Sequence, residues 1–346
     1  MHFVDASNMR AFDLSCEHFS LAQIEELLER CYKYLKPFYM RAQTFYSKTG
    51  KRVRLQSIGL PITSALIQKH VQERDNDMLV ALINTAIDKA VGEGCQIVGF
   101  GGFTSILMQN CKAVQHDALG VTTGNALTIG MGYQALLKRV AETGIDLSCA
   151  CFAAVGANGN IGAVYSELMA EKVASLILIG RPGRERALEA LAEKIYTSAF
   201  RVLSDHLANG GHVAADALAS THALAARIAD THTAQQLLHE LPVADEQLGR
   251  RLHVGLQQEL GESSPIRLST DPAAIGQANL VLGASSHAGS LIFAEHLQDG
   301  PVIICDVALP ADTDPSLPER RPDVTVIKGG LVRVPPVPAQ VAHLNA

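Results

Sequence analysis

The second half of the chain alternates short apolar runs with turns and amphipathic segments. From Leu147, "LSCACFAAVG" has strand character, "NIGAVYSELMAEKV" has helical spacing, and "SLILIGR" is again strand-like. Further runs of strand length are "PIRLST", "ANLVLGASS", "PVIICDVALP" and "VTVIKGG". Strands and helices that alternate in this way predict an α/β fold whose doubly wound parallel sheet is covered on both faces.

The turn after the first of these strands is rich in glycine. In "VGANGNIG" the spacing is GxxGxxG, a variant of the dinucleotide fingerprint. Gly156 would allow a tight exit from the strand, Gly159 a close approach to a pyrophosphate, and Gly162 close packing of helix on sheet. Helix-terminal N–H groups would hold the phosphates, so we expect a Rossmann site here; the alternative is a tight turn that binds nothing. The expected cofactor-binding residues of this turn are Gly156, Asn158, Gly159, Asn160, Ile161 and Gly162.

The residues after the second strand bear on the choice of cofactor. NAD-binding proteins usually place Asp or Glu there, whereas this chain has Gly180 and Arg181, then Arg184. Guanidinium groups attract a 2′-phosphate, so NADPH is the predicted cofactor unless both arginines are simply solvated turn residues. A third part of the site is expected where a later strand ends in small residues that would let the cofactor cross, namely Ala284, Ser285 and Ser286.

The first half of the chain is a mixture of helix and strand. Helical spacing covers residues 21–36 and about 72–92, and "QTFYSKTGKRVRLQS" between them predicts a hairpin. For 346 residues we therefore expect two domains: a mixed α/β substrate domain at 1–140 and a Rossmann domain at 141–335, followed by a Pro-rich tail at 336–346.

Residues 184–262 exceed what one crossover helix needs, and they are Ala-rich and strongly helical, which predicts a helical insertion. It carries six of the thirteen histidines, but no pair stands three or four residues apart, so a metal site is not expected. The insertion is a candidate lid, carrier-docking surface or oligomer contact. Its histidines are His206, His212, His222, His232, His239 and His253.

Composition excludes several classes of function. The net charge is −6 and no run of Lys and Arg forms a stripe, so nucleic-acid binding is not expected. The apolar stretches are too short to span a bilayer and the amino terminus lacks a signal-peptide pattern, which predicts a cytoplasmic protein without stable membrane insertion. Seven cysteines without a CxxC pair favour reduced thiols, and Cys149 and Cys151 are expected on a buried strand.

Two stretches of the first domain are more specific than the glycine turn. These are "VGFGGFTSIL" at 98–107 and "VTTGNALTIGMGYQAL" at 121–136, preceded by "SKTGKRVRLQSIGLP". Together with "VGANGNIG" they resemble the long-chain acyl-acyl carrier protein reductases best known from cyanobacteria, over residues 40–183 and again over about 265–333. The resemblance implies an oxidoreductase that uses NADPH to reduce a fatty acyl thioester, on acyl carrier protein or coenzyme A, to an aldehyde. The first domain would bind the acyl chain and the second the nucleotide.

The two motifs are physically compatible with substrate binding. Gly101 and Gly102 would let backbone approach a ligand, and Thr122, Thr123 and Asn125 offer donors for a thioester carbonyl that gains negative charge. The alternative is a buried Gly-Gly turn followed by a helix cap. The expected substrate-binding residues are Gly101, Gly102, Thr122, Thr123, Gly124 and Asn125.

The chain departs from this family at the nucleophile. Those reductases form an acyl-enzyme on a cysteine well beyond the segment that matches "GGLVR", whereas no cysteine follows Cys305 here. Cys305 lies in the apolar run "VIICDV", where burial would raise its pKa and leave little thiolate. The catalytic residue therefore stays unassigned, with four explanations open: direct hydride transfer to a noncovalently bound thioester or aldehyde, a nucleophile from another chain, a truncated chain, or lost activity.

Two other functions remain open. The first is a dehydrogenase of the shikimate or methylenetetrahydrofolate type, which shares the "ASS" and "ICDV" strand pattern; it would need a Lys–Asp pair in the first domain, and none is convincing. The second is a noncatalytic NADPH-binding partner in a biosynthetic complex. The missing cysteine favours this partner, and the intact glycine turn and TTGN segment disfavour it.

Overall fold

The computed structural model describes residues 2–332, apart from 4, 48, 117–118, 210–214, 242–244 and 288. The chain forms two compact units, Met1–Asn125 and Ala126–Leu331, which are described separately. The division comes earlier than the boundary expected at residue 140, because helix α6 (Asn125–Thr143) packs into the core of the second unit through Ile129, Leu136 and Val140. The predicted tail at 336–346 lies outside the described residues.

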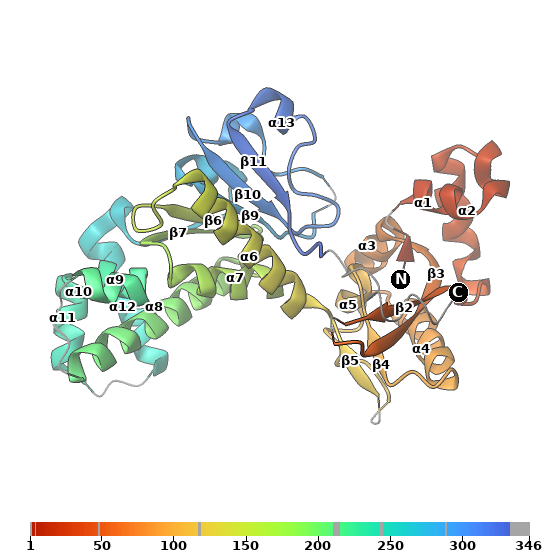
Figure 1. Cartoon of the computed structure of the whole chain (residues 1–346), viewed down its shortest axis with the longest axis horizontal. Coiled ribbons are helices and arrows are strands. Elements are labelled where there is room, and N and C mark those ends of the chain that lie inside the picture. Colours follow the sequence, from red (N-terminus) through yellow and green to blue (C-terminus); the bar gives the residue numbers. More distant parts are fainter. Residues whose placement is uncertain are drawn as a thin grey trace. The chain divides into compact units, whose positions relative to one another are not determined.

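The second unit is built on one parallel sheet of six strands, in the order β8-β7-β6-β9-β10-β11 (Figure 1). The chain starts in the middle at β6, moves outward through β7 and β8, and returns to the other side of β6 at β9. This is the Rossmann order, with its topological switch point between β6 and β9. The prediction of a doubly wound sheet is confirmed, as is each of its strands. The strands are β6 (Cys151–Val155), β7 (Ser175–Ile179), β8 (Ile266–Ser269), β9 (Leu280–Gly283), β10 (Val302–Asp306) and β11 (Val324–Lys328).

Side chains along the strands alternate between two hydrophobic cores, as a strand period of two requires. Phe152 and Ala154 of β6 face the core that is covered by α6, α7 (Asn160–Ala170) and α8 (Glu185–Ala208). Ala153 and Val155 face a smaller core covered by short elements. These include η4 (Pro272–Gln277) and α13 (Leu317–Arg320), with η5 (Ala294–His296) next to η4.

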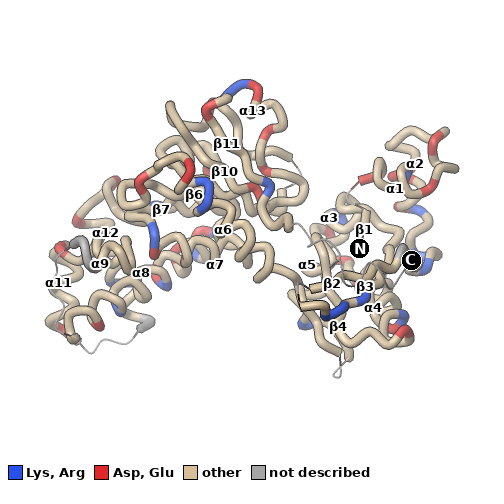
Figure 2. Tube along the Cα trace, in the orientation of Figure 1, with Lys and Arg blue, Asp and Glu red and all other residues tan. Residues whose placement is uncertain are grey.

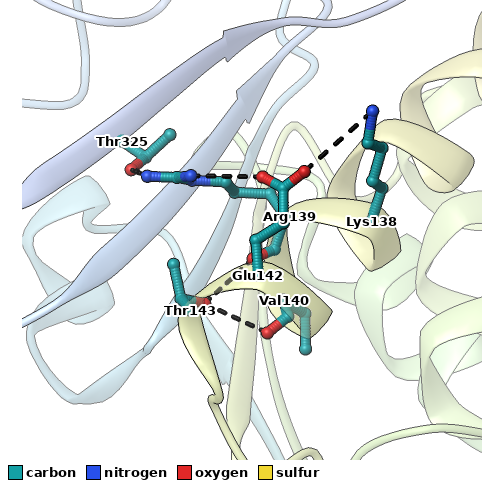
Figure 3. A network of polar contacts seen from close by, with 6 residues as sticks. All are labelled: Lys138, Arg139, Val140, Glu142, Thr143 and Thr325. Atoms are coloured by element: carbon teal, nitrogen blue, oxygen red, sulfur yellow. Dashed lines mark hydrogen bonds and ion pairs between the residues drawn. The ribbon is translucent and has the colours of Figure 1, made fainter.

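Helix α6 is also joined to the sheet by polar contacts (Figure 3). Arg139 donates from Nε and Nη2 to Thr325 Oγ1 on β11, at 3.4 and 3.2 Å, and its Nη1 lies 3.2 Å from Glu142 Oε2. Thr143 Oγ1 donates to the carbonyl oxygens of Arg139 and Val140, which closes the last turn of the helix. The Arg139–Glu142 ion pair is half-exposed and lies within α6, so it adds little stability. The apolar face of α6 is what fixes the helix to the sheet.

The predicted helical insertion is the elaborated crossover from β7 to β8. After α8 the chain forms α9 (Ala215–Thr221), α10 (Ala223–Ala229), α11 (His232–His239), α12 (Asp245–Leu260) and η3 (Gly261–Ser263). Helices α8 and α12 cross at Gly249, where a Cβ atom would lie 2.4 Å from the Glu193 carbonyl oxygen. Leu224, Leu237 and Leu252 share the main core of the sheet, so the insertion and the sheet form one packed body.

The histidines of the insertion have separate local environments. His222 is buried and caps α10, with Nδ1 accepting from Ala225 N at 3.2 Å, and burial lowers its pKa. His232 N donates to Glu259 Oε1 at 2.8 Å. His212 lies outside the described residues. In the part of the chain that the structure describes, no group of three or more His, Cys, Asp and Glu side chains is placed to hold a metal ion.

The first unit contains the sheet β1-β3-β2 and a separate parallel pair, β4 and β5. The hairpin of β2 and β3 turns at Gly50 with φ +79°, which confirms the hairpin prediction. The helix expected at 21–36 ends at Cys31. The helix expected at 72–92 begins at Asp77, because the preceding helix, α3 (Ser64–Glu73), ends at Arg74, whose backbone is in the left-handed region. The strands are β1 (His2–Phe3), β2 (Phe38–Tyr46), β3 (Arg52–Thr63), β4 (Ile97–Gly99) and β5 (Gly120–Thr122). The helices are α1 (Ala6–Phe12), η1 (Leu14–His18), α2 (Leu21–Cys31), η2 (Tyr32–Tyr34), α3 (Ser64–Glu73), α4 (Asp77–Gly92) and α5 (Phe103–Leu107).

Charged residues are sparse along the trace, and basic and acidic positions are interspersed within each unit (Figure 2). Among the described helices, none combines the length and the apolar character needed to cross a membrane.

Candidate functional site

The glycine turn after β6 is fixed by close packing of backbone on backbone. Gly156 has φ +83°, and a Cβ atom on it would lie 2.7 Å from the Ala284 carbonyl oxygen. A Cβ on Gly162 would lie 2.3 Å from the Gly156 carbonyl oxygen, and one on Gly159 3.2 Å from the same oxygen. Since real Cβ atoms do not approach within 3.0 Å, glycine is required at 156 and 162, and position 159 is tight.

The turn delivers α7 to the carboxyl edge of the sheet. The N–H groups of Gly156 and Ala157 both donate to the Ile179 carbonyl oxygen, at 2.9 and 3.0 Å, and α7 begins at Asn160 directly after its cap, Gly159. The first N–H groups of a helix have no acceptor within the helix, and they carry the positive end of its dipole. The turn, called the cradle below, has the geometry that the predicted phosphate site requires: a helix N-terminus at the switch point of the sheet.

The two predicted arginines lie next to this cradle. Val155 of β6 pairs with Ile179 of β7, so Arg181 follows β7 at the level of the glycine turn. Arg181 and Arg184 are both exposed and share one turn, in which Arg184 N donates to the Arg181 carbonyl oxygen at 3.1 Å. The nearby acid, Glu185, accepts from Gly183 N at 2.9 Å. Two guanidinium groups are thus available at the position where a 2′-phosphate would lie.

The small residues after β9 meet the glycine turn from the other side. Ala284 N donates to the Val155 carbonyl oxygen at 3.0 Å, and Ser285 Cα lies 2.8 Å from the ideal Cβ position of Gly156. Ser285 in turn donates from both its backbone N and its Oγ to the carboxylate of Asp312. Ser286 follows in the same segment.

Asp312 and Asp306 are functional candidates that the sequence analysis did not select. Asp312 has no exposed surface, and burial raises its pKa to about 6. Asp306 ends β10 and accepts from the backbone N–H groups of Ala308 at 3.0 Å and Thr313 at 2.8 Å. Asp306 lies in the apolar run "PVIICDVALP", whereas the segment around Asp312 has no motif that would have indicated it.

In the first unit, the two specific motifs are brought together. Because β4 and β5 are parallel neighbours, their carboxyl ends meet at one edge, and Phe100 N donates to the Thr122 carbonyl oxygen at 2.9 Å. Gly102 has φ +56°, and a Cβ there would lie 2.8 Å from His2 Cε1, whereas a Cβ on Gly101 would meet nothing within 4 Å. Gly101 and Gly102 are exposed, and the hydroxyl groups of Thr104 and Ser105 donate back to their carbonyl oxygens.

The TTGN segment forms the turn that leads into α6. Thr122 Oγ1 accepts from Gly124 N at 3.1 Å and Thr123 Oγ1 from Asn125 N at 3.4 Å, with Gly124 at φ +73°. These contacts are those expected of the turn-and-cap alternative. A hydroxyl group that accepts a hydrogen bond still has a proton to donate, so the turn-and-cap contacts do not exclude a ligand contact by Thr122 and Thr123.

The cysteines do not supply an evident nucleophile. Cys305 is completely buried on β10, its Sγ lies 3.7 Å from the Gly132 carbonyl oxygen, and burial raises its pKa to about 11, as the sequence predicts. Cys151 is buried at the start of β6, but the expectation for Cys149 is wrong: it is exposed, in a turn that precedes the strand. The strand begins later than the apolar run because Asp146 and Ser148 form that turn first.

Comparisons with known proteins leave the family open. No family model matches the chain. "Aminotransferase PigE" of Serratia sp. (strain ATCC 39006) is 27% identical over 249 residues, which are 72% of this chain and 22% of that protein. The chain thus spans about a fifth of the length of this curated relative. The crystal structure of one subunit of dipicolinate synthase from Bacillus halodurans matches 71% of this chain and 60% of its own, with 11% identity and a TM-score of 0.30. That likeness is too low to carry an argument, and the fold assignment rests on the strand order.

Proposed function

We propose that this protein is an NADPH-dependent oxidoreductase that reduces a fatty acyl thioester, carried by acyl carrier protein or coenzyme A, to the aldehyde. The observation that supports the nucleotide most directly is the cradle of Gly156, Gly159 and Gly162 at the switch point of a sheet in Rossmann order. Two of these positions admit no side chain, and α7 presents its N-terminus there.

The choice of NADPH over NADH rests on the charge beside the cradle. Arg181 and Arg184 are exposed after β7, where an acidic residue would accept from the ribose hydroxyl groups of NADH and would repel a 2′-phosphate. The pyrophosphate would be held by the first turn of α7, and the small residues 284–286 would border the nicotinamide half.

The substrate half of the proposal rests on Gly101, Gly102 and the TTGN segment. When bound, NADPH supplies a hydride, and with one proton the thioester C–S bond is replaced by a C–H bond, which releases the aldehyde and the free thiol of the carrier. The hydroxyl groups of Thr122 and Thr123 would donate to the thioester carbonyl oxygen as it gains charge, and the exposed glycines would let the acyl group approach the backbone. No covalent step is assigned to Cys305, since its thiol is buried and protonated.

The Serratia relative is compatible with this product. An aminotransferase can use an aldehyde as the acceptor of an amino group, so a segment that makes an aldehyde would suit a protein of that name. Because the match covers 22% of that protein, aminotransferase activity itself is not proposed for this chain.

Two rival functions make different predictions. A shikimate- or methylenetetrahydrofolate-type dehydrogenase would oxidise or reduce a small polar substrate and ignore acyl thioesters. A noncatalytic partner would bind NADPH without turning over either class of substrate.

The insertion at 184–262 is proposed as a carrier-docking surface, lid or oligomer contact, and light scattering with and without acyl carrier protein separates these roles.

The deciding experiment follows absorbance at 340 nm with NADPH and palmitoyl carrier protein, with mass spectrometry of the products and of the intact protein. We expect NADPH consumption matched by aldehyde release and no acyl adduct on the protein. A double variant, Thr122→Val with Thr123→Val, should lose turnover while it keeps NADPH affinity. Nucleotide binding without turnover on any thioester or aldehyde would reject the reductase and favour the noncatalytic partner.

A further inference from the structure

Asp312 carries a buried charge that the proposed chemistry does not use. It lies in the segment after β10, has no exposed surface, and accepts Ser285 N at 2.8 Å on one oxygen and Ser285 Oγ on the other. Two hydrogen bonds to one residue 27 positions earlier in the chain join two loops at the carboxyl edge of the sheet. Burying a carboxylate costs stability unless hydrogen bonds or an opposite charge compensate for its lost hydration.

The loop that Asp312 holds is the one that borders the glycine turn. Ser285 Cα and the Ala284 carbonyl oxygen occupy the space where Gly156 would have a Cβ, at 2.8 and 2.7 Å. The hydroxyl oxygen of Ser285 also accepts from His287 N at 3.1 Å, which extends the hold by two residues. A displacement of Ser285 would therefore move the backbone that lies against the cradle.

Asp306 helps to hold the segment that carries Asp312. Its carboxylate accepts from Thr313 N at 2.8 Å, the residue next to Asp312, and Gly283 leaves the room for both acids: a Cβ there would lie 3.0 Å from Asp306 Oδ1 and 3.0 Å from Asp312 Cβ. The charged groups that act on Asp312 are Asp306 on β10 and His287 in the β9 loop.

We propose that Asp312 is a positioning residue for the nucleotide: its carboxylate holds Ser285, and through it residues 284–287, in the conformation that the bound cofactor meets opposite Gly156. The proposal rests on the nucleotide site of the proposed function and adds a residue that does not touch the cofactor itself. The ionised carboxylate accepts both donors of Ser285 with charge-assisted hydrogen bonds, whereas protonation makes one of its oxygens a donor and weakens the hold on Ser285. Nucleotide affinity should consequently decrease as this carboxyl group becomes protonated.

Burial, and to a smaller extent Asp306, raises the pKa of Asp312; the hydrogen bonds from Ser285 and, less, His287 lower it, and the resulting value is about 6. The contribution of the ionised carboxylate to affinity should therefore be present at pH 8 and disappear as the pH falls through about 6. The 2′-phosphate of NADPH titrates in the same range, so wild type must be compared with an Asp312→Asn variant that shares every other group. NADH, which lacks that phosphate, gives a second profile.

The test measures the Kd of NADPH and NADH by fluorescence titration at several pH values between 5 and 8. Asp312→Asn, Ser285→Ala and the double variant are compared with wild type. The matched control is Asp314→Asn with Ser316→Ala, since Asp314 also accepts from the N and Oγ of a serine, at 2.7 and 2.8 Å, but on the surface. Amide hydrogen exchange of residues 284–287 is recorded without nucleotide, because a positional change should appear there before any ligand binds.

The expected result is a loss of affinity of about tenfold at pH 8 for Asp312→Asn and for Ser285→Ala, with no further loss in the double variant. The pH profile of Asp312→Asn should be flatter than that of wild type, exchange at 284–287 should accelerate, and the Asp314 pair should change none of these. Wild-type affinity in Asp312→Asn, or additive effects in the double variant, would overturn the inference while leaving the nucleotide site intact. Failure of wild type to bind either nucleotide would reject the proposed function and this inference with it.

Discussion

The glycine turns after β6 and after β4, both parallel strands, differ in what makes glycine necessary. After β6, the space beside Gly156 and Gly162 is taken by backbone atoms that have nowhere to move. After β4, the space beside Gly101 is open, and that beside Gly102 holds only the ring of His2. The first turn is thus determined by internal packing, and the proposed nucleotide would use a shape that the fold already requires. At Gly101, packing does not demand glycine, which leaves room there for the proposed substrate contact.

The largest effect that would test this difference is expected for Gly162→Ala. The added Cβ would lie 2.3 Å from the Gly156 carbonyl oxygen and 2.9 Å from Ala157 Cα, so α7 must shift away from the turn. Overpacking of this kind costs about 3 kcal/mol. We expect a fall of that size in the free energy of unfolding, with loss of NADPH binding.

The matched control for Gly162 is Gly130→Ala, since Gly130 is also helical and a Cβ there would meet nothing within 4 Å. Alanine should be neutral there or should stabilise by about 0.5–1 kcal/mol. Urea unfolding measures both variants. If Gly162→Ala unfolded like Gly130→Ala, the packing explanation of the glycine spacing would be wrong.

The next effect concerns the pH dependence of stability at Asp312. Its pKa is about 6 in the folded protein and near 3.8 in the unfolded chain, so the folded state binds more protons between these values. The free energy of unfolding should therefore fall as the pH rises through this window, by about 3 kcal/mol in total. Asp312→Asn lacks this term, so the stability of wild type relative to the variant should decrease from pH 4 to pH 7.

Urea unfolding at each pH measures this difference. Asp314 provides the opposite sign, because hydrogen bonds from Ser316 lower its pKa and its contribution is lost as the pH falls. A difference between wild type and Asp312→Asn that stays constant with pH would show that Asp312 is not a buried titrating group.

The strands of the second unit were predictable because each is a short apolar run between turns, and the glycine spacing predicted where the first helix begins. The domain boundary was not predictable in this way. The apolar stripe of α6 indicates that the helix packs against a core, but it does not indicate which of the two units supplies that core. For Cys149, composition suggested a strand, but Ser148 donates two hydrogen bonds to Asp146 and so forms a turn before the strand begins. Asp312 was missed for a related reason: its importance comes from a contact with Ser285, far away in sequence, and one residue in a loop has no period to indicate it.

A smaller effect is expected at the arginines beside the cradle. Arg181→Ser with Arg184→Ser removes two exposed guanidinium groups that pack against no core, so stability should change by less than about 0.5 kcal/mol. NADPH should bind about tenfold more weakly and NADH about as before. Titration with both nucleotides gives the ratio. Arg250→Ser, on the exposed side of α12, controls for the loss of a positive charge elsewhere on the surface, and an equal loss of NADH affinity in the double variant would reject the 2′-phosphate assignment.

The smallest change in stability is expected for Gly101→Ala, which tests the glycine turn after β4. A methyl group at this exposed position meets nothing within 4 Å, and its φ lies outside the left-handed region, so the free energy of unfolding should stay within about 0.5 kcal/mol of wild type. NADPH affinity should also be unchanged, because Gly101 is not among the predicted cofactor-binding residues. If a thioester lies against this backbone, the methyl group should raise its KM severalfold without lowering stability. Gly102→Ala would behave differently, since φ +56° makes alanine strained whatever the ligand does. An unchanged KM in Gly101→Ala would mean that neither packing nor substrate explains the exposed glycine, and the substrate site would then have to lie away from the end of β4.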